Sequence, residues 1–153
     1  MAKFKFDGID YISASFEQLS NISDEEKMSI IRPAAEFLKT TYQKVIRSKF
    51  RQISGALADS ISVEQKSDDD GAYAHVTPKG KHPGSGTGKR KRKNGRSNGR
   101  YSGTNAEVAY ILNFGSPRIA ATHWMDNAND EVADEVIAIQ QEKWDELITQ
   151  KGL

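Results

Sequence analysis

The sequence predicts an α+β domain in which a small antiparallel sheet packs against two long helices. Two stretches, residues 23–50 and 126–150, repeat apolar side chains every three or four positions, as amphipathic helices do. Two shorter alternating stretches, residues 61–64 and 73–77, flank a polar turn, which is typical of a β-hairpin. Helices covering an antiparallel sheet give such elements a shared core. The chain of 153 residues has the size of one domain, so we expect a single domain over residues 1–153.

The amino-terminal residues predict two short elements. Phe4 and Phe6 alternate with polar residues, which indicates a short strand before a turn at Gly8. Apolar residues then recur at helical spacing and predict a short helix over residues 9–19. They are Ile9, Ile12, Phe16 and Leu19.

The first long helix has a clear predicted start. Ser23 is followed three residues later by Glu26, the pattern of a capping box. Pro33 lacks the N–H group that an interior helical residue donates, so we expect a kink or a division into two helices there. The face predicted to enter the core consists of Ile31, Ala34, Leu38, Tyr42, Val45 and Ile46.

A hairpin is predicted after the helix. Ile61 and Val63 alternate with polar residues, which indicates a half-buried strand. The turn falls in the Ser-Asp-Asp-Asp-Gly cluster at residues 67–71, and residues 73–77 form the returning strand. The aspartates lack the ligand spacing of a calcium loop, so we interpret them as a solvated turn.

The most apolar run, residues 108–112, is predicted as a third and buried strand, because it is short and rich in β-branched and aromatic residues. Gly115 permits a turn and Pro117 cannot donate to a strand ladder, so the run should end there. Trp124 is predicted to be a large buried anchor before the last helix. That helix should bury Ala133, Val136, Ile137, Gln140, Trp144, Leu147 and Ile148 and end at Gly152.

Residues 78–105 form a basic, glycine-rich insertion between the predicted strands. The whole chain has a net charge of +1, and nine cations without an acid lie within residues 79–100, so the rest carries −8. Clustered cations attract nucleic-acid phosphates whatever the base sequence. They equally suit an acidic protein face, a nuclear-import signal or a solvated loop, and the sequence leaves these alternatives open. The nine cations are Lys79, Lys81, Lys89, Arg90, Lys91, Arg92, Lys93, Arg96 and Arg100.

Catalytic chemistry finds little support in the sequence. Cysteine is absent, and His75, His82 and His123 are not spaced as metal ligands. The GSGTGK stretch at residues 84–89 departs from a phosphate-binding loop, because Pro83 stands where the first glycine belongs and Arg90 where Ser or Thr belongs. No signal peptide or membrane span is apparent. We therefore expect no enzyme activity, no metal and no cofactor.

Three stretches follow one another in an informative order. They are FDGID at residues 6–10, SGALADSI at residues 54–61, and a third that runs from Tyr110 through Asn113 and Phe114 to Gly115 and Ser116. Together they resemble the small neck and tail-completion proteins of long-tailed bacteriophages. Arg118, Ala121, Trp124 and Ala128 fall where that family tends to have Arg, Ala, Phe and Ala.

The resemblance implies a non-enzymatic structural protein of the virion, made in the bacterial cytoplasm and placed at the head–tail connector or tail-completion position. It implies a hexameric ring through which DNA passes, contacts with head-closure, tail-terminator or tail-tube proteins, and no membrane. The alternative is a nucleic-acid-binding protein that uses the basic insertion. The residues marked as structural are Ser54, Gly55, Leu57, Ser60, Ile61, Tyr110, Phe114, Gly115, Arg118 and Trp124. We expect Ser54 and Gly55 to turn helix into strand, and Leu57 and Ile61 to enter the core.

Overall fold

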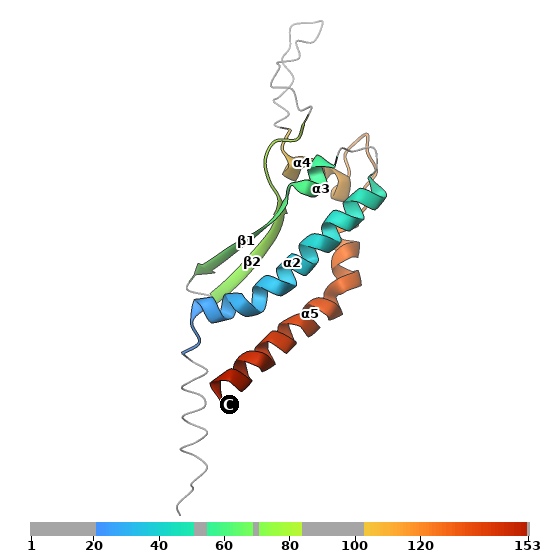
Figure 1. The fold of residues 1–153 in the computed structure, drawn as a ribbon. Coiled ribbons are helices and arrows are strands. Elements are labelled where there is room, and N and C mark those ends of the chain that lie inside the picture. Colours follow the sequence, from blue (N-terminus) through green and yellow to red (C-terminus); the bar gives the residue numbers. More distant parts are fainter. Residues whose placement is uncertain (1–20, 51–54, 69–70, 84–102, 153) are drawn as a thin grey trace, which may run out of the picture.

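The computed structural model describes residues 21–50, 55–68, 71–83 and 103–152, and these form an α+β fold (Figure 1). The long helices α2 (Asp24–Lys49) and α5 (Trp124–Lys151) lie side by side, and the hairpin of β1 (Ile61–Asp68) and β2 (Gly71–Pro78) packs along α2. The short helices α3 (Ala56–Asp59) and α4 (Asn105–Phe114) sit at one end of this assembly. The predicted strand and helix before residue 20 lie outside the described residues.

Helix α2 starts as predicted. The Ser23 hydroxyl accepts a hydrogen bond from the Glu26 N–H at 3.3 Å, and the Glu26 carboxylate accepts one from the Ser23 N–H at 2.8 Å. The helix then runs without division through Pro33 to Lys49, so the alternative of two separate helices is wrong. Ala34 and Ala35, which directly follow the proline, are buried, and this packing offsets its missing N–H group. The predicted core face is confirmed at Ala34, Tyr42 and Ile46, which are buried.

The predicted hairpin is confirmed. Strands β1 and β2 pair antiparallel with Val63 opposite Val76 and Asp68 opposite Gly71. Among the described residues the sheet has these two strands alone, because the segment predicted as its third strand is helical. The basic insertion therefore lies between β2 and α4 rather than between two strands.

The apolar run at residues 108–112 belongs to α4, and its prediction as a strand is wrong. Thr104 and Glu107 form a second capping box, with each backbone N–H 3.2 Å from the other's side-chain oxygen. This cap starts a helix before the apolar run begins. The buried positions follow a helical spacing of three or four residues, which an alternating strand would not produce. They are Asn105, Ala109, Leu112 and Asn113.

Helix α5 begins at Trp124, two residues before its predicted start, and its core face differs from the predicted one. Leu147 is buried as predicted, but Ala133 is exposed, and Ile137 and Trp144 are 59% and 39% exposed. The helix instead buries Trp124, Ala128 and Val132 near its start. Helical periodicity identified the element, but the neighbours that cover each face are set by the tertiary fold.

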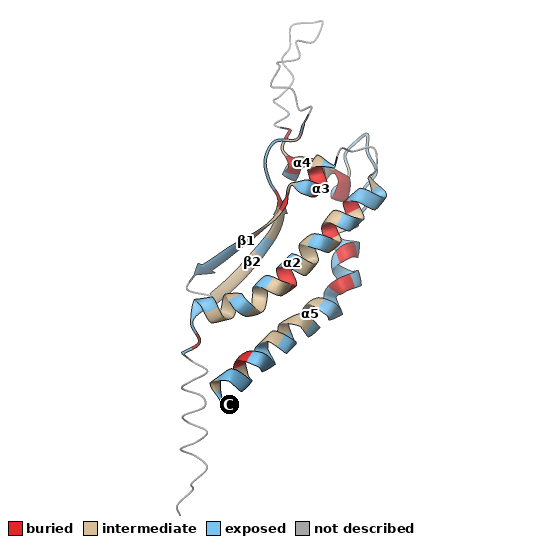
Figure 2. Ribbon diagram, viewed as in Figure 1, coloured by how far each residue is buried: buried red, intermediate tan, exposed pale blue. Residues whose placement is uncertain are grey.

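Trp124 is the centre of the core and confirms the predicted anchor. It is fully buried, and its ring meets those of Tyr42 and Phe50 edge-on at centroid distances of 5.4 and 6.3 Å. Its indole N–H donates to the Ala109 carbonyl at 3.4 Å. Most buried residues gather around it, where α2, α3, α4 and the start of α5 meet (Figure 2). Leu57 and Ile61 lie in this cluster, also as predicted.

At the end of the domain away from Trp124, an ion pair joins the last turn of α5 to the first turn of α2. The Lys151 ammonium lies 2.8 Å from the Glu26 carboxylate. Hydrogen bonds from Lys151 and from the Ser23 backbone hold the pKa of Glu26 at about 2, below its ordinary value of 4.5. Within the part of the chain described, every helix is too short or too polar to cross a lipid bilayer.

Replacing Trp124 with alanine should lower the free energy of unfolding by about 3–5 kcal/mol, because it leaves a large cavity between three helices. Urea unfolding followed by far-ultraviolet circular dichroism measures the loss. Tyr110→Ala is the control and should lose clearly less, since Tyr110 is 62% exposed. Equal losses for the two variants would contradict the central position of Trp124.

The Glu26→Gln variant should change the pH dependence of stability. The folded state lowers the pKa of Glu26 to about 2, so its carboxylate stabilises the fold fully above about pH 4.5 and progressively less as the pH falls toward 2. Thermal unfolding at pH 6 should therefore show a less stable variant, and the difference should shrink below pH 4.5. Glu25→Gln, which removes an exposed carboxylate from the same turn, serves as the control. A difference that does not change with pH would refute the assignment.

Candidate assembly surface

The basic insertion is closed at its base by the buried side chain of Asn105. The Asn105 amide donates to the Lys79 carbonyl at 2.7 Å, and its oxygen lies 2.9 Å from Nδ1 of His82. The Asn105 backbone N–H donates to the Gly80 carbonyl at 3.0 Å. The backbone N–H of His82 donates to the Gly103 carbonyl at 2.6 Å. Residues 79–82 and 103–105, which we call the loop base, therefore lie side by side.

The loop base continues directly into α4. Lys81 and Thr104 pair as an isolated antiparallel bridge, and Thr104 is the N-cap of the helix. Gly80 and Gly103 have φ angles of 79° and 59°, a left-handed conformation that glycine adopts without strain. The position of the loop base is thus set by a helix that is itself packed in the core.

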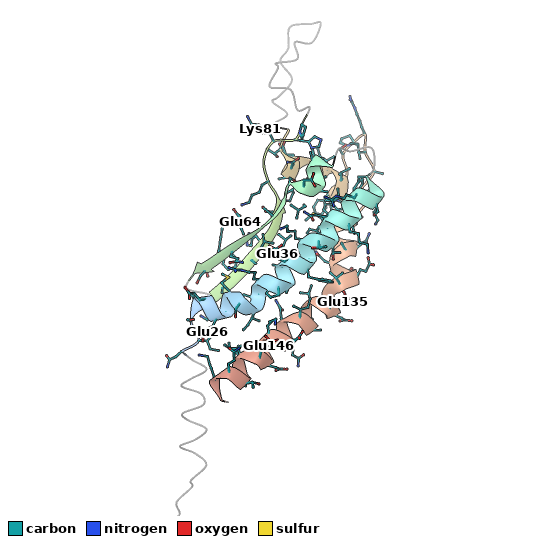
Figure 3. The ribbon with its side chains drawn as sticks, in the orientation of Figure 1. Glu26, Glu36, Glu64, Lys81, Glu135 and Glu146 are labelled. Carbon is teal, nitrogen blue, oxygen red and sulfur yellow. The ribbon has the colours of Figure 1, made fainter. Side chains whose placement is uncertain are left out.

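The two described cations of the insertion have different surroundings. Lys79 binds the carboxylate of Glu64 on β1, and this hydrogen bond and the ammonium charge lower the pKa of Glu64. Lys81 is exposed at the end of the fold that carries α3 and α4, away from Glu64 on the hairpin (Figure 3). The remaining predicted contact residues lie outside the described residues: Lys89, Arg90, Lys91, Arg92, Lys93, Arg96 and Arg100.

Two aromatic side chains project from α4 on the face turned away from the core. Tyr110 and Phe114 are 62% and 53% exposed, and their ring centroids lie 4.7 Å apart. Ile119, in the connector that follows, is 46% exposed, and Arg118 is exposed beside it. We call Tyr110 and Phe114 the aromatic pair. Neighbouring aromatic rings left exposed to water on a helix are typical of protein contact surfaces.

A second buried asparagine, Asn113, joins α4 to α5. Its side-chain oxygen accepts the Met125 N–H at 2.9 Å, and its amide donates to the Asp126 carboxylate at 3.2 Å. The N-cap residue of α5, His123, has a left-handed conformation and makes no side-chain cap bond. Asn113 therefore caps α5 from a neighbouring helix. This bond fixes the angle at which α4 displays the aromatic pair.

Gly115 ends α4 and reverses the chain into the connector. Its φ of 82° and ψ of −178° belong to a region that only glycine adopts freely. A Cβ atom at this position would lie 2.8 Å from the Ala121 nitrogen and 2.9 Å from the Ile119 carbonyl oxygen. The predicted turn is confirmed, although it follows a helix and not a strand.

The other motif residues have structural positions. Gly55 is the N-cap of α3 with a φ of −51°, so the predicted turn from helix to strand is wrong at this residue, because a short helix intervenes. The Ser60 hydroxyl donates to the Leu57 carbonyl at 2.7 Å at the end of α3. The Arg118 N–H donates to the Ser116 hydroxyl at 3.4 Å. Ser54 lies outside the described residues.

Sequence reasoning missed Asn105, and it noted Asn113 in the third motif without giving it the role of capping α5. The capping box of Thr104 and Glu107 could have indicated the helix, and with it the faces of α4. No sequence pattern indicated that Asn105 and Asn113 are buried, because an isolated asparagine usually lies on the surface.

Neither a metal site nor a known relative defines the surface further. Within the described ranges, no cluster of three or more His, Cys, Asp or Glu side chains is arranged to hold a metal ion. Comparison with models of protein families, with curated proteins and with solved structures finds no significant match. The resemblance to phage neck proteins therefore stays a prediction from the sequence.

Replacing Gly115 with alanine should lower the free energy of unfolding by at least about 3 kcal/mol, because backbone strain adds to a clash with the connector backbone. Gly152→Ala separates the two effects, since Gly152 also has a positive φ of 73° but open space around its Cβ position. That control should lose only about 1–2 kcal/mol. Chemical denaturation measures both, and equal losses would show that the contacts with Ile119 and Ala121 do not constrain the connector.

Proposed function

We propose that the chain is a non-enzymatic structural protein of a bacteriophage virion, acting in a ring at the head–tail connector or tail-completion position. The observation that carries the proposal is the convergence of contact features at one end of the fold. The loop base, the aromatic pair and the connector all extend from α4, which is packed against Trp124. Such an end is suited to binding macromolecules, and the sequence resemblance supplies the class of assembly.

The charge distribution supports contacts between copies. Helix α5 exposes a series of carboxylates along its length, with Glu135 and Glu146 labelled in Figure 3. The loop base, with exposed Lys81, lies at the other end of the domain beside α4 (Figure 3). A contact between unlike surfaces of successive copies is heterologous and closes into a ring when its rotation allows. Opposite charges on the two surfaces would favour the correct register. The exposed acids on α5 are Asp126, Asp130, Glu131, Asp134, Glu135, Glu142, Asp145 and Glu146.

The loop base allows the insertion to be removed without opening the core. The backbone N–H of His82 donates to the Gly103 carbonyl, so the two ends of the insertion lie close together. A short Gly-Ser turn can therefore replace residues 84–102 while the hydrogen bonds of Asn105 remain. In a phage genome that encodes the chain, this replacement should leave a folded monomer of unchanged thermal stability but prevent its incorporation into particles. Electron microscopy, plaque counts and mass spectrometry of purified virions measure the effect.

A variant of full length in which the seven insertion cations beyond residue 83 become glutamine separates charge from length. Loss of incorporation in both variants supports a charged contact. Fully infectious particles carrying the replacement would refute the role of the insertion, and absence of the native chain from purified virions would refute the proposed function.

Direct nucleic-acid binding is the second candidate, and the observation that favours it is the hydrogen-bonded loop base, in which Lys81 is exposed. The purified chain would then bind a fluorescein-labelled duplex, and its affinity would fall steeply with salt as counterions are released. Fluorescence anisotropy at low salt measures this. Binding that the glutamine variant abolishes favours this candidate, and no binding removes it.

A further inference from the structure

An apolar groove remains uncovered at the end of the domain opposite α4. It lies between the first turns of α2, the start of β2 and the second half of α5, and it is a shallow, open groove of about 450 Å³. Ile30 and Ile31 line one wall, Ala72 lies at its end, and Ile137 and Trp144 line the other wall. Ile137 and Trp144 are among the most exposed large apolar side chains in the described residues. Apolar surface gathered in a groove is stabilised when another apolar segment covers it.

The chain itself supplies a segment of the right character next to this groove. The described residues begin at Asn21, which lies in a turn, and Ile22 beside it is buried. Helix α2 starts at Asp24, so its groove-lining residues fall within its first two turns. Residues 9–19, immediately before this point, carry apolar side chains at the spacing of an amphipathic helix: Ile9, Ile12, Phe16 and Leu19.

We propose that residues 9–19 dock as an amphipathic helix in the groove of their own chain. Eleven helical residues span about 16 Å, enough to cover the roughly 10 Å between Ile137 and Trp144 along α5. The connection through residues 20–23 has the length of the loop in an antiparallel helix pair, which is usually two to five residues. So short a tether gives the segment a millimolar effective concentration at its own groove, far above that of another copy in dilute solution. This inference concerns the free chain and is independent of the proposed virion function.

Cysteine cross-linking in the full-length chain tests the proposal, and the absence of native cysteine makes it clean. The pair Phe16→Cys and Gln141→Cys places one thiol on the apolar face of the segment and one at the rim of the groove. The control pair Ala14→Cys and Gln141→Cys uses the opposite face of the same predicted helix. The first pair should form an intrachain disulfide about tenfold faster than the control, because only docked sulfurs come within bonding distance.

Three outcomes are distinguished on a non-reducing gel. A fast monomeric cross-link for the first pair supports the proposal. Equal rates for both pairs would overturn it, since the segment would then have no fixed face toward the groove. Cross-linked dimers would also overturn it, because they would show that a second copy covers the groove.

Fluorescence of Trp144 gives an independent measurement. Phe16→Asp should shift the emission of Trp144 to the red and increase its quenching by acrylamide, because it would undock the segment. Ala14→Asp should leave both unchanged. In a Trp144→Phe background Trp124 is the remaining tryptophan, so the same comparison there measures any contribution from Trp124. A shift that persists in that background would count against the proposal.

Discussion

The contacts of Trp124 hold together the end of the domain that carries α3 and α4. This one side chain, at the first residue of α5, packs on Tyr42 and Phe50 at the end of α2 and bonds to the Ala109 carbonyl of α4. A fully buried tryptophan contributes several kilocalories per mole through its area alone. Because three helices meet at it, the position of α4, and with it the loop base and the aromatic pair, depends on this contact.

Hydrogen bonds from two buried asparagines fix the orientation of α4. Asn105 fixes the start of α4 to the loop base, and Asn113 fixes its end to the first turn of α5. A buried amide left without partners costs about 1–3 kcal/mol, so each bond excludes alternative placements of the helix that apolar contacts alone would tolerate. The domain thus displays one ordered end with exposed aromatic rings and a cationic insertion, an arrangement suited to contacts with large partners.

Local sequence patterns correctly predicted the elements for which the pattern fits one type of secondary structure only. The capping box at Ser23 identified α2, and alternation around Ile61 identified the hairpin. The run at residues 108–112 was misassigned because five apolar residues fit a strand or a buried helix equally well, and the cap at Thr104 decides between them. The site was predicted only in part, since Tyr110 and Phe114 were singled out but the buried bonds of Asn105 and Asn113 depend on tertiary contacts. The exposed face of α5 likewise depends on which neighbours reach Ile137 and Trp144.

Hydrogen–deuterium exchange of the free chain tests most directly whether α4 is a helix held by the core. If Trp124, Asn105 and Asn113 fix it, the amides of Ala109 to Asn113 should exchange as slowly as those in the middle of α2, because both would open only on global unfolding. An isolated helix of ten residues would fray and exchange quickly. Fast exchange throughout α4, with α2 still protected, would contradict the account.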